Sequence, residues 1–452
     1  MIRHRTYAAR SSHLLRPDCI GPAYADDTIM TPTSPQTHSN SLPFLTADIP
    51  GVPAAIKRRY EDFQVEEIAA YEPSGSGDHT YFTIEKRGLA TMRAVNDIAR
   101  ALGVPAKNIG LAGLKDARAV TVQTLSIEHT DPERVRELDI PRIKILNVTR
   151  HGNKLKIGHL RGNRFRIRLR QIEGERTGDI RAVCETLVTR GVPNYFGSQR
   201  FGSRGDTWEI GRAVLMNDPK TAVDLILGTP GPFDKGEVFK ARRLYEAGDF
   251  AGAAKAWPYG FRDNVRMCRE LDRTKGKHNR AFHAVDMRMK KFYVNAFQSY
   301  LFNLVLARRI NEIDQIKTGD LAFKHENGAV FRVEDAAAES PRAAAFDISP
   351  TGPIYGFKMT EPEGEPAAIE SEVLAGQDLK PDDFRAMARM KIHGARRPLR
   401  FKPEGLEIDD GQDQYGPYVE LRFTLSSGCY ATMILAEVCK QHLEEGLEDD
   451  QP

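Results

Sequence analysis

Residues 113–123 read Gly-Leu-Lys-Asp-Ala-Arg-Ala-Val-Thr-Val-Gln, and the rest of the fold is built outward from them. They lie between an apolar run, Ile109 to Leu111, and an alternating run, Ala119 to Ile127. This pattern predicts two strands joined by a polar turn. The turn carries one acid, Asp116, between two bases. Aspartate in a turn commonly hydrogen-bonds its own backbone, so turn chemistry and catalysis are both open for Asp116 at this point.

The composition is that of a globular protein without membrane helices. The chain has 452 residues, of which 28% are charged and 40% hydrophobic, and this length suits two or three domains. No apolar run approaches the roughly 18 residues of a membrane helix. The five cysteines show no CxxC spacing, which favours a reducing cytoplasm over a disulfide framework or a zinc site. Phosphate-loop, GxGxxG, HExxH and GxSxG motifs are missing, which excludes the commonest nucleotide-binding and hydrolase classes.

Positive charge is segregated along the sequence although the net charge is only +3. Ten Lys or Arg and no acid lie between 142 and 170, and seven bases and no acid lie between 385 and 402. Segregated positive charge on a nearly neutral chain predicts a polyanionic partner. The alternative is two solvated basic faces.

Both ends of the chain are predicted to lie outside the fold. Residues 1–45 are rich in Ser, Thr, Pro and Arg, which predicts a disordered extension. The acid-free start resembles a transit peptide, and the other explanation is that Met30 is the true start. Residues 441–452 form an acidic tail.

A helix before the first of the two central strands is predicted to place Asp116 at a strand end. We expect Thr91 to cap this helix and Gly103 to end it. Its predicted buried stripe consists of Met92, Val95, Ile98, Ala99 and Leu102.

The segment from 158 to 170 predicts a strand with two contrasting faces. Phe165, Ile167 and Leu169 are expected to pack on a core. The alternate positions form a row of guanidinium groups, Arg164, Arg166, Arg168 and Arg170. Neighbouring like charges repel unless anions lie against them, and either acidic side chains of the same fold or phosphates meet that need. Gly162 with Asn163 permits a tight turn at the entry of the strand.

Residues 193–202, Pro-Asn-Tyr-Phe-Gly-Ser-Gln-Arg-Phe-Gly, combine aromatic, amide and guanidinium groups among glycines. A packed loop and a site for unstacked bases both fit this composition. Tyr195 and Phe201 are expected in the core, because alternate residues face inward.

Residues 221–390 change character and predict an inserted domain. The flanking segments, 46–220 and 391–440, are predicted to form one catalytic domain, because a late strand (Val419 to Leu425) and a last helix complete its sheet. The predicted fold class is α+β, with a mixed, mainly antiparallel sheet flanked by helices and interrupted by a large inserted α/β domain.

Several different motifs follow one another in a fixed order along residues 49 to 440. They are Lys57 with Glu61-Asp62-Phe63; Gly113-Leu114-Lys115-Asp116 with Ala119, Thr121 and Gln123; Gly162-Asn163-Arg164-Phe165; residues 193–202; Gln298-Ser299 with Leu301-Phe302-Asn303; Arg396-Arg397-Pro398; and Gly428 with Tyr430-Ala431-Thr432. In this order they resemble the TruD-type tRNA pseudouridine synthases.

The resemblance implies a pseudouridine-synthase catalytic domain that converts a uridine of tRNA to pseudouridine, at position 13 in bacterial members. It implies tRNA as the partner and no metal, organic cofactor or nucleotide cofactor, and we expect a cytoplasmic monomer. Asp116 matches the essential catalytic acid of the family, and Lys57 matches its basic partner. Asn194 and Phe196 match the active-site amide and aromatic residue, and Gln123 is assigned to substrate binding with them.

The implied reaction moves C1′ from N1 to C5 of the base and loses no group. A carboxylate that attacks C1′, adds to C6 or removes the 2′ proton would serve, and the residues leave all three routes open. Asp116 must be ionised for each, and Lys57 is expected to keep it so in a closed pocket. Lys115 is expected to face phosphate or solvent, because adjacent residues of an extended chain point to opposite sides.

The remaining predicted contacts concern the RNA. Phe196 is expected to stack on an extruded uracil, and Asn194 to offer a donor and an acceptor to a uracil edge or to the carboxylate. The arginines expected to hold phosphates are Arg164, Arg166, Arg168, Arg170, Arg396 and Arg397. Two other classes compete: an RNA-binding protein without chemistry, and a glycosidase, which needs two paired acids.

Overall fold

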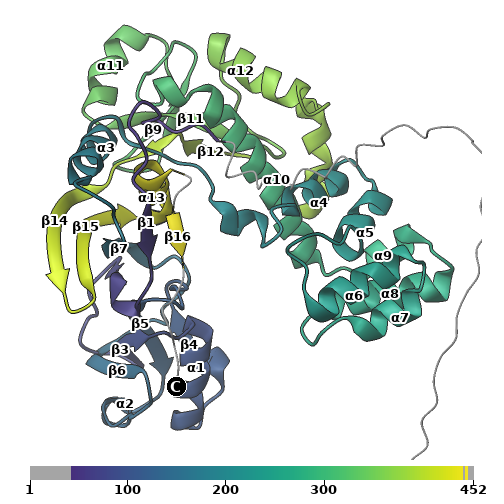
Figure 1. Cartoon of the computed structure of the whole chain (residues 1–452), viewed down its shortest axis with the longest axis horizontal. Helices are drawn as coiled ribbons and strands as arrows, with labels where there is room; N and C mark the ends of the chain where they lie inside the picture. Colours follow the sequence, from purple (N-terminus) through teal and green to yellow (C-terminus); the bar gives the residue numbers. More distant parts are fainter. Residues whose placement is uncertain (1–41, 441–442, 446–452) are drawn as a thin grey trace, which may run out of the picture. The chain divides into compact units, whose positions relative to one another are not determined.

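The computed structural model describes residues 42–440 and 443–445 (Figure 1). Its larger sheet has the strand order β14-β15-β7-β2-β5-β3-β6, with β4 paired to β5, β1 to β7 and β16 to β1. The strands of this sheet are β1 (Ala54–Ile56), β2 (Phe63–Ala69), β3 (His79–Arg87), β4 (Ile109–Leu111), β5 (Val120–Glu128), β6 (Ile143–His151), β7 (Leu160–Arg170), β14 (Glu404–Asp413), β15 (Gly416–Ser426) and β16 (Leu443–Glu445).

The pairing in this sheet is mixed and mainly antiparallel, which confirms the predicted fold class. β2 runs parallel to β5, and β1 runs parallel to β16. Neighbours elsewhere along the strand order run antiparallel. β15 pairs with β7 along its length, so that Val419 lies opposite Leu169. The late strand therefore completes the sheet that the first half of the chain begins, as predicted.

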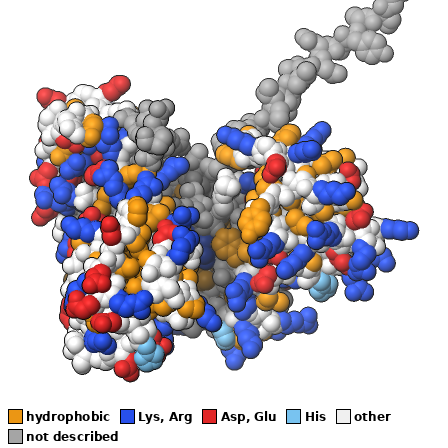
Figure 2. Space-filling view, turned by 90° about the horizontal axis from the view of Figure 1, so that it is seen from below, with side chains coloured by type: hydrophobic (Ala, Val, Ile, Leu, Met, Phe, Trp, Pro, Cys, Tyr) orange, Lys and Arg blue, Asp and Glu red, His pale blue; other side chains and the backbone are white. Residues whose placement is uncertain are grey.

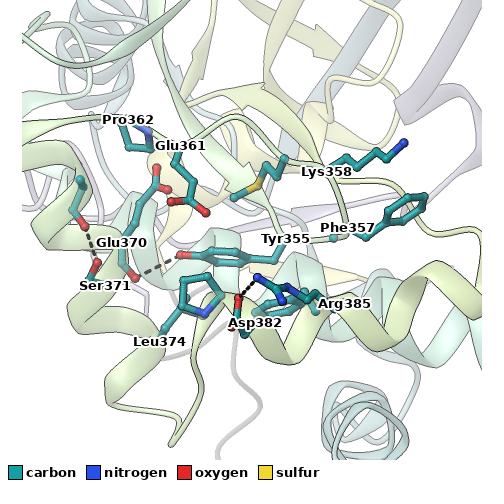
Figure 3. A pocket seen from close by; sticks show the side chains of 15 residues that line it. Tyr355, Phe357, Lys358, Glu361, Pro362, Glu370, Ser371, Leu374, Asp382 and Arg385 are labelled. Carbon is teal, nitrogen blue, oxygen red and sulfur yellow. Dashed lines mark hydrogen bonds and ion pairs between the residues drawn. The ribbon is translucent and has the colours of Figure 1, made fainter.

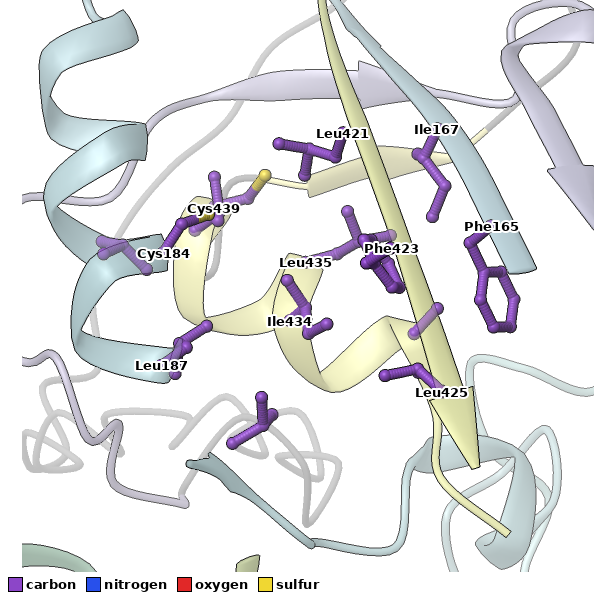
Figure 4. Close-up of a cluster of buried hydrophobic side chains, with 14 of the residues drawn as sticks. Phe165, Ile167, Cys184, Leu187, Leu421, Phe423, Leu425, Ile434, Leu435 and Cys439 are labelled. Atoms are coloured by element: carbon purple, nitrogen blue, oxygen red, sulfur yellow. The ribbon is translucent and has the colours of Figure 1, made fainter. Parts of the chain in front are cut away.

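Helices cover the sheet and close its cores. They are α1 (Thr91–Leu102), α2 (Pro132–Arg136), α3 (Thr177–Arg190) and α13 (Ala431–Cys439), with 3-10 turns η2 (Tyr60–Asp62) and η3 (Ala106–Asn108). One core joins the apolar faces of β7 and β15 to α3 and α13 (Figure 4). Phe165, Ile167 and Leu169 are all buried in it, as their alternation predicts. A second core packs α1 against β3, β5 and β6.

Two details of α1 differ from the prediction. Its N-cap is Ala90, and the hydroxyl of Thr91 bonds elsewhere. Met92 is about half exposed (49%), because the buried face runs through Thr91, Ala94 and Val95 instead. Gly103 ends the helix in the left-handed conformation (φ 71°), as predicted.

The middle of the chain is a run of helices followed by a smaller sheet with the order β10-β9-β11-β12. The helices are α4 (Thr207–Leu215), α5 (Pro219–Leu227), α6 (Gly236–Glu246), α7 (Phe250–Ala256), α8 (Arg262–Thr274), α9 (His278–His283), α10 (Met287–Arg308), α11 (Ala336–Ala344) and α12 (Gly364–Ala375), with 3-10 segments η4 (Ser198–Phe201), η5 (Ile310–Glu312) and η6 (Pro381–Met390). The remaining strands are β8 (Val192–Pro193), β9 (Leu321–Lys324), β10 (Val330–Arg332), β11 (Ile348–Ile354), β12 (Ala395–Pro398) and β13 (Arg400–Phe401).

This middle region agrees with the predicted helical character of the insertion. The domain limits themselves stay a prediction, and β12 bonds to β11 across the expected limit at 390. Within residues 42–440, no helix is both long enough and apolar enough to span a membrane.

The described structure extends into both predicted tails, at residues 42–45 and 443–445. Leu45 is buried, and the backbone N–H groups of Leu45 and Thr46 donate to the carboxylate of Glu437 at 2.8 and 3.1 Å. At the other end, β16 pairs with β1. The predictions for residues 1–41, 441–442 and 446–452 lie outside the described residues.

The predicted arginine row is present on β7, but carboxylates of the same sheet neutralise it. Arg164 pairs with Glu66 at 2.6 Å, Arg166 and Arg168 with Glu420 at 2.7 and 2.9 Å, and Arg170 with Asp62 and Asp413, both at 2.7 Å. The face of the molecule in Figure 2 likewise shows acidic and basic side chains intermixed. Of the two explanations for the row, acids of the fold are therefore the one observed, and the row needs no phosphates.

Gly162 lies inside β7, where a turn was expected at the strand entry. It sits opposite Ser426 of β15. A Cβ on Gly162 would lie 2.3 Å from the carbonyl oxygen of Leu425. The glycine is therefore required for the close approach of two strands.

Removal of Asp62 is expected to destabilise the protein far more than removal of Glu66. Asp62 is fully buried against Arg170, so Asp62→Ala leaves a buried guanidinium short of a partner and costs about 3 kcal/mol. Glu66→Ala breaks an exposed pair on the same sheet and costs at most about 1 kcal/mol. Urea unfolding followed by circular dichroism measures the loss of stability in both variants. Equal shifts in the two unfolding midpoints would contradict the difference expected between the buried and the exposed ion pair.

Candidate active site

Asp116 lies in the loop between β4 and β5, and Lys57 meets it from the end of β1. The two strands pair antiparallel, with Ile109 opposite Ile127, as predicted for the central stretch. Nζ of Lys57 lies 2.8 Å from Oδ2 of Asp116. The backbone N–H of Arg118 donates to Oδ1 at 3.0 Å, which is the ordinary turn bond of an aspartate. Asp116 therefore combines turn chemistry with the expected ion pair.

The backbone around Lys57 is shaped to deliver this ammonium group. Lys57 is buried and has a φ of 55°, a left-handed conformation that is costly for a residue with a side chain. Its Nζ also lies 4.6 Å from the centre of the Phe63 ring. Strain of this kind persists where the surrounding fold holds it, and it concentrates at functional sites.

Asp116 is held in its ionised form. Burial raises the pKa of the Asp116 carboxyl, but the hydrogen bond and charge of Lys57, the Arg118 N–H and the charge of Lys86 together lower it further. The net result is a pKa below the ordinary value. The carboxyl is therefore an anion at neutral pH although it is largely shielded from water.

A second lysine, Lys86 of β3, supports the loop from beneath and was not predicted. Its side chain is fully buried, and Nζ donates to the carbonyl oxygens of Leu89 at 2.6 Å and Asp116 at 2.9 Å. Burial lowers the pKa of Lys86 to about 8, against the opposing effect of the Asp116 charge. The sequence did carry a signal, because Lys86 falls in phase with the buried Phe82 and Ile84 of the same strand.

Lys115 turns inward to a buried carboxylate, so the expectation that it faces solvent is wrong. Its Nζ lies 2.8 Å from Oε2 of Glu67 and donates to Oδ1 of Asn163 at 2.8 Å. The side chains of Lys115 and Glu67 are only 5% and 2% exposed. The expectation failed because it assumed an extended chain, whereas this segment is a loop with a buried carboxylate beside it.

Gln123 lies buried behind the loop, and its assignment to substrate binding stays a prediction. It is 1% exposed, and its Oε1 accepts from the Thr91 hydroxyl at 3.0 Å. The same hydroxyl accepts from the backbone N–H of Lys115 at 2.9 Å. Gln123 and Thr91 therefore position the residue next to Asp116.

The side-chain amide of Asn194 forms hydrogen bonds at both of its ends within the protein. Its Nδ2 donates to the carbonyl oxygen of Pro398 at 2.8 Å, and its Oδ1 accepts from Nη2 of Arg397. One donor and one acceptor position of the amide are thus used within the fold, and the contact of Asn194 with a uracil edge stays a prediction. Asn194 also fixes the Arg397 guanidinium, whose Cζ lies 4.4 Å from the centre of the Phe196 ring.

Phe196 presents its ring to a cavity of about 750 Å³ that also contains Asp116. Asn303 of α10 accepts from the backbone N–H of Phe196 at 2.8 Å and donates to its carbonyl oxygen at 3.0 Å. Other residues that line the cavity are Phe63, Leu114, Lys115, Asn163, Arg200 and Tyr430. Tyr195 and Phe201 are buried, as predicted.

Arg164, Arg166 and Arg168 do not line this cavity, and neither does Arg396, which is paired with the buried Glu370 of α12. A smaller cavity of about 210 Å³ lies near Glu370, between residues 355–362, α12 and η6 (Figure 3). Its charged side chains include Arg385 and Asp382, which pair with each other at 2.8 Å. The larger cavity is the better candidate, because it contains the Lys57–Asp116 ion pair beside Phe196, whereas the Asp382 carboxylate of the smaller cavity is paired with an exposed arginine. Within the described residues, no group of His, Cys, Asp or Glu is arranged to hold a metal ion.

Replacing Lys57 is expected to raise the pKa of Asp116. In Lys57→Met the burial of the carboxyl remains and its main counter-charge is lost, so the carboxyl ¹³C titration should move to higher pH. The wild-type pair stabilises the fold above the unfolded pKa of about 3.9, and this contribution is lost as pH falls through the lower folded pKa. Lys220→Met, which breaks an exposed pair on α5, is the control. An unmoved Asp116 titration would mean that Lys57 does not set its charge.

Comparison with known proteins shows the family to which this chain is similar. The family model described as tRNA pseudouridine synthase D (TruD) matches residues 41–438. The tRNA pseudouridine synthase D of Geobacter sp. (strain M21) is 45% identical over 398 residues, which cover 88% of this chain and 99% of that protein. The protein of the same name from Geobacter sulfurreducens is 45% identical over 399 residues, covering 88% and 97%.

A solved structure gives the same result. The putative tRNA pseudouridine synthase D (TruD) of Methanosarcina mazei superposes with a TM-score of 0.77 at 28% identity, covering 89% of this chain and 97% of that one. The chain therefore belongs to the TruD family of tRNA pseudouridine synthases.

Proposed function

We propose that this protein converts uridine 13 of tRNA to pseudouridine, with Asp116 as the catalytic carboxylate. The observation that carries the proposal is the Lys57–Asp116 ion pair at 2.8 Å, on the wall of a cavity of about 750 Å³ that also presents Phe196. Family membership supports the reaction class and the tRNA substrate. The choice of position 13 rests on the family resemblance of the motifs.

The chemistry requires an anionic oxygen near the ribose or the base. The bond from N1 to C1′ breaks and a bond from C5 to C1′ forms, and the C5 proton moves to N1, so atoms balance without a co-reactant. The Asp116 carboxylate suits attack at C1′, addition to C6 or removal of the 2′ proton. Lys57 occupies Oδ2, and Oδ1 accepts a backbone N–H, so the carboxylate is oriented before substrate arrives.

The target base must leave the RNA stack to reach Asp116. Extrusion of a base costs a few kcal/mol, and stacking on an aromatic ring returns about 1–3 kcal/mol. Phe196 lines the cavity and is fixed through both of its backbone groups by Asn303. It is therefore placed to receive the uracil with little further ordering.

Substitution of Asp116 by Asn is expected to abolish turnover and to keep tRNA binding. The two side chains have the same shape, but the amide carries no charge for any of the three routes. Pseudouridine is mapped on unmodified tRNA by carbodiimide treatment and primer extension, and binding is measured by filter retention. Asp97→Asn on the outer face of α1 is the matched control, since Asp97 pairs only with arginines of its own helix.

The outcomes separate the proposal from its rivals. Turnover by Asp116→Asn would show that another group is catalytic. Binding without product by the wild-type chain would favour an RNA-binding protein without chemistry. A substrate in which uridine 13 is replaced by cytidine should give no product, and product at another position would remove the position assignment.

Loss of the Phe196 ring is expected to slow the reaction. Phe196→Leu keeps apolar volume against Phe302 but removes the stacking face, so kcat/KM should fall roughly tenfold or more. Phe196→Tyr keeps the face and should retain most activity. Wild-type rates in Phe196→Leu would make this ring a packing residue only.

A further inference from the structure

Arg200, which lines the cavity, and Arg397, which lies against the same Phe196 ring, lack the carboxylate partner that the arginine row of β7 has. Arg200 of η4 and Arg397 of β12 both approach the Phe196 ring, with Cζ atoms 5.6 and 4.4 Å from its centre. Within the described residues, neither has a carboxylate within 4.0 Å. Four arginines of β7 (Arg164, Arg166, Arg168 and Arg170) and Arg396 each have one. Two positive charges therefore converge on one aromatic ring without a counter-ion.

Each of the two guanidinium groups is oriented but only partly used. Nε of Arg200 donates to the Ser299 hydroxyl at 3.0 Å, and that hydroxyl donates to the carbonyl oxygen of Asn295 at 2.9 Å. Arg397 is held by Asn194 and by the carbonyl oxygen of Gly428. A guanidinium has five N–H donors, so Arg200 keeps its terminal donors for a ligand.

The arrangement is unfavourable until an anion arrives. Burial lowers the pKa of both groups, and the charge of Arg200 lowers that of Arg397 further. Both nevertheless stay protonated, as arginine does in proteins. A partly buried pair of like charges is costly when empty, and an anion between them offsets that cost.

We propose that Arg200 and Arg397 form a phosphodiester-binding site for the nucleotide whose base enters the cavity. The guanidinium fork matches two oxygens of a phosphate, and RNA carries one phosphodiester for each nucleotide. Arg200 lines the same cavity as Asp116, so the phosphate it binds belongs to the target nucleotide or its direct neighbour. The site positions the sugar over Asp116 and reads no sequence. This inference rests on the proposed function.

The test is a double-mutant cycle. It combines the removal of the Arg200 charge with the removal of the charge of one phosphate. Ligated tRNAs carry a neutral methylphosphonate either 5′ or 3′ of the target uridine, with 2′-O-methyl on the adjoining sugar. Each has a control tRNA with the same sugar and an ordinary diester. Binding is measured by fluorescence anisotropy in Asp116→Asn, which does not turn the RNA over. Arg200→Met is compared with Arg200→Lys, which keeps the charge, and with Arg100→Met on the exposed face of α1 as the surface-charge control.

We expect Arg200→Met to weaken binding of the diester tRNAs about tenfold and to reduce the salt slope by about one. Arg200→Lys should lose less, and Arg100→Met should lose almost nothing. With the methylphosphonate at the contacted linkage, Arg200→Met should cause no further loss. Ser299→Ala, which removes only the orienting bond, should give a smaller loss on the same tRNA.

Equal losses for Arg200→Met on every tRNA, including both neutral ones, would make Arg200 a structural residue and overturn the inference. No loss on any tRNA would overturn it as well. Failure of the proposed function is a separate result, because it appears as lack of pseudouridine when the wild-type chain meets unmodified tRNA. Thermal melting of Arg200→Met identifies a variant that fails to fold, and Arg200→Lys then decides the question.

Discussion

The ion pair between Lys57 and Asp116 is the constraint on which the rest of the site depends. The two residues are brought together by the sheet: Lys57 follows β1, which pairs with β7, while Asp116 precedes β5, which pairs with β2 beside β7. A change in the order of these strands would separate the ammonium from the carboxylate. The strand order of the sheet thus holds the Asp116 carboxylate beside Lys57, where it is largely shielded from water.

Three lysines surround the loop of Asp116, and each has a different task. Lys57 neutralises the carboxylate, Lys86 holds the carbonyl of the same residue, and Lys115 is matched by the buried Glu67. A buried charge is tolerated only when it is paired or hydrogen-bonded, so each lysine is fixed by its own partner. The loop is therefore rigid before any substrate binds, and such preorganisation favours a catalytic over a purely structural role.

The arginines divide into two groups by the same rule. Arg164, Arg166, Arg168 and Arg170 of β7 are compensated by nearby acids, and Arg396 by Glu370, so they stabilise the fold. Arg200, which lines the cavity, and Arg397, which lies against the Phe196 ring, have no acid partner within the described residues. The proposed phosphodiester site therefore rests on the lack of an acid partner beside the cavity, rather than on the number of bases in a stretch of sequence.

The residues alone were enough to predict the elements with a clear period and to single out Asp116 in its turn. The alternation of Phe165, Ile167 and Leu169 was sufficient for β7, and the turn at Asp116 was sufficient for its loop, because both signals are local. Lys86 was missed, although its phase with Phe82 and Ile84 showed that it faces inward. What it bonds to beneath the loop is a long-range fact that periodicity does not contain.

Only the tertiary structure decided which charges are neutralised. Arg168 meets Glu420 across 252 positions of the chain, and Arg397 meets Asn194 across 203. The sequence therefore showed a basic row and an amide that could bind RNA. In the folded chain, the row forms ion pairs and the amide forms hydrogen bonds within the protein. Electrostatic energy depends on the distance between two charges in space. The sequence neighbours of an arginine therefore do not show which distant residue neutralises its charge.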